Sequence, residues 1–183
     1  MAQRFHTLEV AGIRRELPIL NVTDELAIAG FIMLGDVELT DACARALAEK
    51  VPKETEVLLT AETKGIPLAA ELARCLGMKR YVVARKSVKA YMEDAIWVED
   101  RSITTKGVQK LCLDGADKVR IAGKNVLLLD DVVSTGGSMK ALTELADKAG
   151  GKIVGEACVL AEGKAAERKE LIFLEALPLF DAK

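Results

Sequence analysis

Residues 126–138 read Val-Leu-Leu-Leu-Asp-Asp-Val-Val-Ser-Thr-Gly-Gly-Ser, and this stretch decides the fold. It opens with four apolar residues, which are typical of a strand buried on both faces, and continues into two adjacent carboxylates, Asp130 and Asp131. A turn rich in serine, threonine and glycine leads into a helix expected over 135–149, which a Gly-Gly pair ends. The stretch therefore predicts one strand–turn–helix unit of an α/β fold.

The same rhythm of apolar strands and helices recurs on both sides of this unit. Strands are predicted over 56–61, 81–84, 125–129 and 152–161, and helices over 40–50 and 67–76. Such strands, separated by helices, indicate a central, mostly parallel sheet flanked by helices. Because ligands of these sheets bind at the carboxyl ends of the strands, the residues after Ala61, Ala84 and Leu129 are expected to face one crevice.

The flanking segments are less regular. Residues 7–22 are expected to form short strands, and Thr40 or Asp41 is expected to cap the first helix. The apolar run 26–33 fits a strand or a helix. Residues 85–125 break the rhythm and predict a long excursion with a β-hairpin, which is either a lid over a binding site or an ordinary edge hairpin.

The turn at 134–138 has the chemistry of a phosphate cradle. Its glycines let the backbone approach a ligand and point N–H groups at it, and the N-terminus of the helix adds partial positive charge. The hydroxyls donate further hydrogen bonds, whereas the carboxylates of Asp130 and Asp131 suit ligand hydroxyls or a divalent cation. Phosphate, diol and metal together describe a sugar phosphate. The residues of the cradle are Ser134, Thr135, Gly136, Gly137 and Ser138.

Other phosphate-binding motifs do not fit the rest of the sequence. An apolar strand that ends in two acids is also typical of P-loop ATPases, but the G-x-x-x-x-G-K-[ST] run that they require is absent. No G-x-G-x-x-G run exists either, which disfavours a dinucleotide site. A plain strand–turn–helix would explain a lone Ser-Thr-Gly-Gly, but it does not explain the whole run.

Composition narrows the classes of protein further. The 183 residues include 26 Lys and Arg against 28 Asp and Glu, so no overall positive field exists to hold a nucleic acid. One histidine and four widely spaced cysteines exclude a Cys/His zinc cluster and a histidine-based triad, and predict buried cysteines in a reducing compartment. The sequence shows no signal peptide, and the apolar run 26–34 is too short to span a bilayer. We therefore expect a soluble, cytoplasmic protein without nucleic-acid or membrane partners.

Taken whole, the run 126–138 resembles the phosphoribosyl-pyrophosphate (PRPP) signature of the type I phosphoribosyltransferases, in which two acids and two variable residues precede a small residue and Thr-Gly-Gly-Thr/Ser. Residues 60–72 (TAETKGIPLAAEL) are similar to the pyrophosphate loop and following helix of the adenine and xanthine enzymes. Residues 82–89 (VVARKSVK) are similar to their next strand with its basic exit. The resemblance covers more than half of the chain.

The resemblance implies the fold of that family for a single domain over 1–183. It implies a small hood built from 1–35 and about 162–183, and a long flexible β-hairpin loop at 86–110. Related enzymes are commonly dimers, so the resemblance also implies a homodimer.

Site roles follow from the same resemblance. The cradle residues 134–138 would hold the 5′-phosphate of PRPP, and Asp130 and Asp131 would serve catalysis by binding the ribose hydroxyls near Mg²⁺, the implied cofactor. Phe31 and Met33 would contact the base, unless they pack in the core. The pyrophosphate group would be bound by Thr63, Lys64, Gly65, Arg85, Lys86 and Lys89, and the flexible loop would contribute Thr104, Thr105 and Lys106.

The implied reaction is transfer of a 5-phosphoribosyl group from PRPP to a purine, with release of pyrophosphate, and adenine is the first acceptor. Xanthine or another purine is the alternative acceptor. The chain departs from the adenine enzymes at two places. Lys64 stands where arginine is typical, which keeps the charge but loses the bidentate fork. Ile103–Gly107 lacks their Glu and Tyr, and this loop is more similar to that of the xanthine enzymes. A non-catalytic regulator that senses PRPP or a purine is a further alternative.

Overall fold

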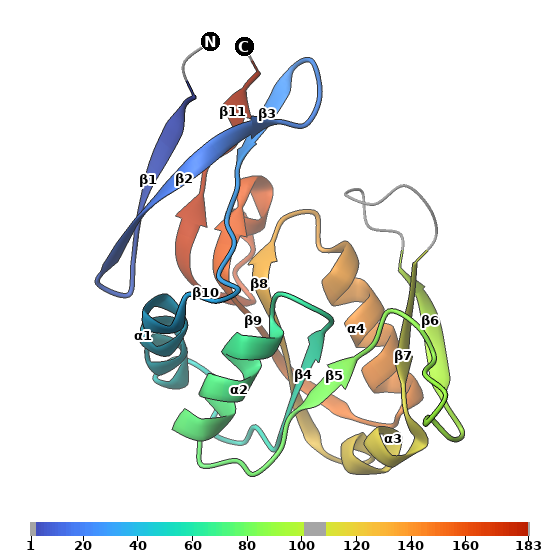
Figure 1. Cartoon of the computed structure of the whole chain (residues 1–183). Helices are drawn as coiled ribbons and strands as arrows, with labels where there is room; N and C mark the ends of the chain where they lie inside the picture. The colour runs from blue at the N-terminus through green and yellow to red at the C-terminus, as the bar shows by residue number, and fades with distance from the viewer. Residues whose placement is uncertain (1–2, 101–108, 183) are drawn as a thin grey trace.

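Five parallel strands form the central sheet of the computed structural model, which describes residues 3–100 and 109–182 (Figure 1). Their order is β10-β9-β8-β4-β5, and every neighbouring pair is parallel, which confirms the predicted sheet. Helices cover both faces, so the inner strands are apolar without alternation. The strands are β4 (Val57–Ala61), β5 (Val82–Ala84), β8 (Asn125–Val133), β9 (Lys152–Glu162) and β10 (Leu171–Leu177).

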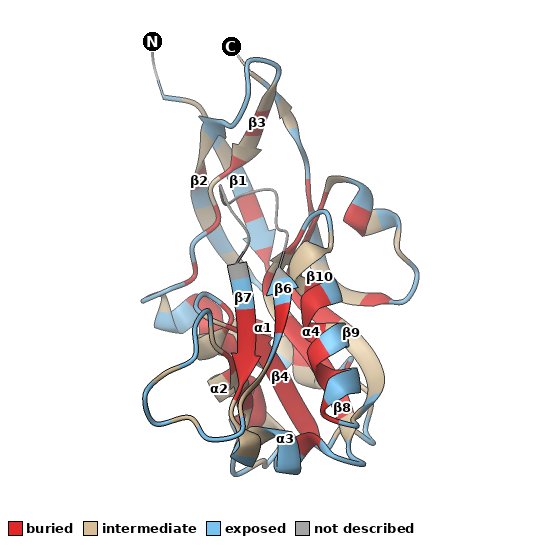
Figure 2. Cartoon of the chain, turned by 90° about the vertical axis from the view of Figure 1, so that its right-hand side faces the viewer, coloured by how far each residue is buried: buried red, intermediate tan, exposed pale blue. Residues whose placement is uncertain are grey.

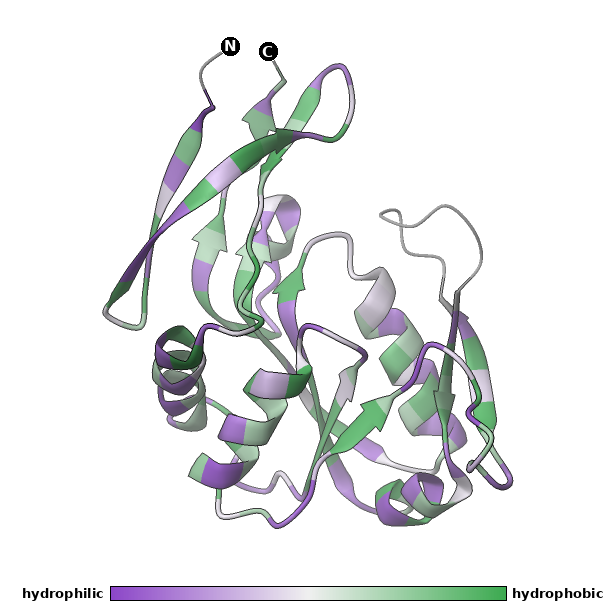
Figure 3. Cartoon of the chain, in the orientation of Figure 1, coloured by the Kyte–Doolittle hydropathy of each residue, from purple (hydrophilic) through white to green (hydrophobic). Residues whose placement is uncertain are grey.

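The helices divide the core into two clusters, one on each face of the sheet. Leu127 of β8 packs with residues of α1 and α2, whereas its neighbour Leu128 packs with residues of α4. Figure 2 shows buried residues along the central strands, and Figure 3 shows hydrophobic and hydrophilic residues on each helix. The helices are α1 (Val37–Ala48), α2 (Ile66–Cys75), α3 (Gly115–Ile121), α4 (Gly137–Lys148) and the short 3-10 helix η1 (Gly163–Glu167).

A second, antiparallel sheet lies beyond the carboxyl ends of the central strands, and we call it the hood sheet (Figure 1). The predicted contribution of 162–183 to the hood is too large. β10 belongs to the central sheet, where buried Leu171 and Leu177 pair with β9, and β11 is the strand of this region that joins the hood sheet. The hood sheet consists of β1 (Phe5–Val10), β2 (Ile13–Asn21), β3 (Leu26–Ala29) and β11 (Phe180–Asp181).

A β-hairpin occupies the predicted excursion. Its strands β6 (Ile96–Asp100) and β7 (Gln109–Leu113) are antiparallel. The hairpin packs against α4 through apolar side chains, and two N–H···O hydrogen bonds of 2.8 Å between Arg85 and Cys112 join it to the end of β5. The predicted loop residues Thr104, Thr105 and Lys106 lie outside the described residues.

The first helix begins earlier than predicted. Its N-cap is Asp36, not Thr40 or Asp41, because the Asp36 carboxylate accepts a hydrogen bond of 3.1 Å from the N–H of Leu39. Nε of Arg15 donates to the same carboxylate at 2.8 Å and ties the start of α1 to the hood sheet. The signal for this cap is local, since Leu39 is three residues along the chain, but the sequence analysis placed the start of the helix too late.

The decisive strand is longer than its apolar run. β8 continues through Val133, since its pairing with β9 persists at Val132 and Val133, so Asp130 and Asp131 lie within the strand and not after it. The following helix starts at residue 137, two residues later than predicted. Gly136 has a φ of +83°, a left-handed conformation that an α-helix excludes.

Candidate functional site

The carboxyl edge of the central sheet brings together the three segments that the sequence analysis singled out. The segments lie at the carboxyl ends of β8, β4 and β5, and these strands are neighbours in the sheet. They comprise residues 130–138, 62–65 and 85–89. Residues that are far apart in the chain therefore share one edge, as expected for a parallel sheet.

Asp130 and Asp131 form a carboxylate pair near the end of β8. Asp131 is only 2% exposed, and its Oδ2 accepts a hydrogen bond of 2.7 Å from Nζ of Lys64. The N–H of Asp131 donates to Oδ1 of Asp130 at 2.9 Å. Burial, together with the negative charge of Asp131, raises the pKa of Asp130 well above its usual value. Lys64 compensates one of two charges, so the pair favours a ligand that brings a cation or hydroxyl donors.

The backbone of the turn between β8 and α4 has a conformation that leaves room for an anion close to its N–H groups. The left-handed Gly136 is the N-cap of α4, and this conformation would cost another residue about 1–2 kcal/mol. Ser134 and Thr135 are exposed, and no side chain of the described residues caps α4. The first N–H groups of the helix therefore lack a side-chain acceptor, and they carry the partial positive charge of the helix N-terminus.

Arg168 lies beside this turn, and the sequence analysis missed it. A Cβ on Gly136 would lie 3.7 Å from Nη1 of Arg168. The guanidinium also forms ion pairs of 2.6 Å with Glu156 and 2.8 Å with Glu170, which fix its position. No local pattern marks Arg168, because the pairing of β9 with β10 brings it to the turn.

The loop between β4 and α2 requires glycine at position 65. A Cβ on Gly65 would collide with Oγ1 of Thr60, a fully buried hydroxyl that has no hydrogen-bond partner among the described residues. The same Cβ would lie 3.6 Å from Oδ1 of Asp130. The peptide bond of Glu62–Thr63 in this loop is cis. Gly65 thus lets the loop pass directly against the carboxylate pair.

The basic residues after β5 are organised around Glu62. Nε of Arg85 lies 3.2 Å from Oε2 of Glu62, and Nη1 of Arg85 donates to the hydroxyl of Tyr91 at 2.8 Å. The N–H of Lys86 donates to Oε2 of Glu62 at 2.9 Å, and this bond and the Arg85 guanidinium lower the pKa of Glu62. The side chain of Lys86 is exposed and that of Lys89 half-buried, so these cations border the same edge.

Replacing Glu62 with glutamine is expected to destabilise the protein by about 1–2 kcal/mol at neutral pH. The pKa of Glu62 is lower in the folded chain than in the unfolded chain. Its stabilisation is therefore complete above the unfolded pKa of about 4.3 and is lost as pH falls through the folded pKa. Thermal unfolding across this range measures the effect, with the exposed Glu54→Gln as the control. Identical pH profiles for wild type and Glu62→Gln would contradict the prediction.

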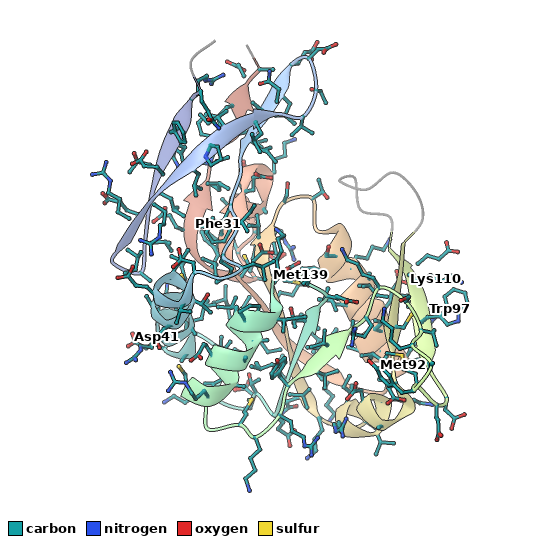
Figure 4. The ribbon with its side chains drawn as sticks, viewed as in Figure 1. Phe31, Asp41, Met92, Trp97, Lys110 and Met139 are labelled. Carbon is teal, nitrogen blue, oxygen red and sulfur yellow. The ribbon has the colours of Figure 1, made fainter. Side chains whose placement is uncertain are left out.

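Phe31 and Met33, predicted to contact a base or to pack in the core, lie in the core. Phe31, labelled in Figure 4, is 5% exposed and Met33 is 0% exposed. Both belong to the cluster shared by the hood sheet, α1 and α2. Side chains along this loop alternate between buried and exposed, so Ile32 and Leu34 are exposed. Met33 has no surface left for a ligand in this structure.

Glu162 is a buried carboxylate at the same edge, and the sequence analysis passed over it. It ends β9, is 8% exposed, and its side chain has no hydrogen bond or ion pair with any described residue. Its neighbour Ala161 packs in the cluster of α4, so alternation places Glu162 on the opposite face, which meets the hood sheet. The signal was an acid that ends an apolar run, the same signal that revealed Asp130.

Within the described ranges, no three His, Cys, Asp or Glu side chains gather as a metal-binding group. The carboxylate pair alone offers the oxygen ligands that Mg²⁺ prefers, and ligand oxygens and water would have to complete its shell. The four cysteines are free, and all except Cys75 are buried. None of the helices in the described residues combines the length and the apolar character needed to cross a membrane.

Fold and site together define a class: an α/β protein whose parallel sheet carries a glycine turn at a helix N-terminus, two carboxylates and several cations on one edge. This set of groups suits a phosphorylated sugar. Residues 36–176 match the model of the phosphoribosyl transferase domain, and the chain belongs to that family.

Two relatives illustrate its place in the family. The chain is 35% identical over 127 residues to a hypoxanthine/guanine phosphoribosyltransferase of Methanothermococcus okinawensis, and the match covers 67% of this chain and 65% of that protein. It is 33% identical over 131 residues to an adenine phosphoribosyltransferase of Bifidobacterium longum, with 70% and 65% covered. The chain thus spans slightly less than two thirds of the length of both relatives.

The fold is that of solved adenine phosphoribosyltransferases. The structure of the enzyme from Rhodothermus marinus superposes with a TM-score of 0.66 at 24% identity, over 94% of each chain. At this identity the likeness establishes the central sheet and the hood, not the base.

Proposed function

We propose that the protein transfers a 5-phosphoribosyl group from PRPP to a purine and releases pyrophosphate. The Asp130–Asp131 pair supports this most directly, because it stands between the glycine turn on one side and Lys64 of the β4–α2 loop on the other. One edge then has separate places for the 5′-phosphate, the ribose hydroxyls and pyrophosphate. The cradle would be 134–138, the hydroxyl acceptors Asp130 and Asp131, and the pyrophosphate contacts Thr63, Lys64, Gly65, Arg85, Lys86 and Lys89.

Such a site would act mainly by positioning and by stabilising charge. Pyrophosphate leaves with negative charge, and the exposed cations Lys64 and Lys86 border the place where it would leave. Asp130 and Asp131 fit Mg²⁺, since Lys64 compensates only one of their two charges. When bound, the ion would supply positive charge to the leaving pyrophosphate.

Adenine is the acceptor that we propose first. The carboxylate of Glu162 has no partner and lies on the face that meets the hood sheet, where it would accept a hydrogen bond from the amino group of adenine. The carboxylate would repel the carbonyl oxygen that a 6-oxopurine has in the place of this amino group. Hypoxanthine or guanine is the second candidate, favoured by the relative named above.

A pyrophosphate-release assay with Mg²⁺ and PRPP, run in parallel on adenine, hypoxanthine, guanine, xanthine and orotate, tests the proposal. We expect kcat/KM for adenine to exceed that for every other base by about tenfold or more. Turnover of 6-oxopurines alone would replace adenine with the second candidate, and turnover of orotate alone would overturn the purine assignment. Tight PRPP binding without turnover of any base would identify a regulator. The proposal includes a cytoplasmic homodimer, which sedimentation and cell fractionation test.

A further inference from the structure

A cavity lies away from the carboxyl edge, at the amino-terminal end of β5. Its volume is about 360 Å³, which is within the range of small-molecule sites. Its walls come from the second half of α2, the loop that enters β5 and the end of α3. None of the residues assigned to the carboxyl edge lines it.

The rim of this cavity is strongly basic. Its charged lining residues are Arg74, Lys79, Arg80 and Arg120, and no carboxylate lines it. Arg74 and Arg120 each pair with an acid three residues earlier on their own helix. Lys79 and Arg80 are exposed and form no hydrogen bond or ion pair with a described residue. Four cations therefore face one cavity in a chain whose net charge is −2.

Half-buried Met78 and Tyr81 give the cavity an apolar part beside these cations. An aromatic ring and a thioether offer a surface for a flat ring, while the cations suit phosphates. The C-terminus of α2 contributes a partial negative charge of about half a unit, which the unpaired charges of Lys79 and Arg80 outweigh. The combination of an apolar surface and a basic rim is the chemistry of a nucleotide site.

We propose that this cavity binds a phosphate-bearing small molecule, with Lys79 and Arg80 as its principal phosphate contacts. Arg74 and Arg120 add charge, although their own acids already engage them. Two kinds of ligand have this chemistry: a nucleoside triphosphate and a free polyphosphate chain. The apolar part of the cavity takes up a base only in the first case.

Calorimetric titration of the full chain with inorganic tripolyphosphate, and separately with ATP, tests the proposal. We expect two binding sites per chain, one at the carboxyl edge and one in the cavity. The double variant Lys79→Ala/Arg80→Ala is expected to retain the first site and to bind at the second about tenfold or more weakly, because two charge-assisted hydrogen bonds are lost. The exposed pair Lys53→Ala/Lys169→Ala removes the same charge elsewhere and should retain both sites.

The two probes separate the two sources of the ligand. Tighter binding of ATP than of tripolyphosphate at the second site supports a nucleotide, and equal binding supports a polyphosphate. A double variant that binds both probes as the control pair does would overturn the proposal, whether wild type shows one site or two. Because the readout is binding, this result is independent of whether any base is turned over.

Discussion

The Asp131→Asn variant is expected to lose a factor of about a hundred to a thousand in kcat/KM for pyrophosphate release while it stays folded. Asp131 is nearly fully buried, and it connects the end of β8 to Lys64 of the β4–α2 loop. Asparagine has almost the same shape, but it cannot hold the lysine by charge or compensate a cation. Both the proposed ribose contact and the position of the loop should be weakened.

Folding should survive this substitution. Removing one partner of an ion pair is costly when the other charge is left buried, but the side chain of Lys64 is 47% exposed and water would solvate it. Asp130 would also lose a negative neighbour that raises its pKa. Melting curves and PRPP binding should accompany the assay, with Asp147→Asn on exposed α4 surface as the control. Turnover within about twofold of wild type would remove Asp131 from the reaction.

Gly65→Ala is expected to abolish PRPP binding and to lower stability by about 1–3 kcal/mol. The added methyl group would collide with the hydroxyl of Thr60, which is fully buried in β4. The loop would have to move off the carboxylate pair, and Lys64 would move with it.

Thr60→Ala supplies the matched partner for this test. The Thr60 hydroxyl has no hydrogen-bond partner among the described residues, so its removal alone should be mild. If the collision is the cause, Gly65→Ala/Thr60→Ala should recover much of the stability and PRPP binding that Gly65→Ala loses. Strictly additive effects in this double-mutant cycle would show that the collision is not the reason for glycine.

The central sheet and its carboxyl edge could be predicted because short, continuous stretches of sequence mark them. A continuous apolar run marks each inner strand. The turn that follows Val133 consists of serine, threonine and glycine, a composition typical of phosphate-binding turns. The parallel order of β8, β4 and β5 then brings separate strand ends to one edge. Their predicted roles in binding still await the experiments above.

Much of what the sequence analysis missed depends on long-range pairing. Arg168 reaches the glycine turn because β10 pairs with β9, and nothing near Arg168 in the chain indicates this. The loop after β3 turns Met33 inward and Ile32 outward, a choice that packing against the hood sheet makes. β10 joined the central sheet for a related reason, since a short apolar strand fits either sheet until its partner is known.

The hood sheet is assembled from both ends of the described chain. β11 pairs with β3, and Nη1 of Arg4 donates to the carbonyl of Asp181 at 2.9 Å across a sequence separation of 177 residues. During synthesis on the ribosome, β4 and β8 can pair long before residue 181 emerges. The central pair that carries the proposed phosphate-binding edge needs no residue beyond β8, whereas the hood sheet is complete only when β11 has been made, which makes the hood the later of the two to finish in a nascent chain.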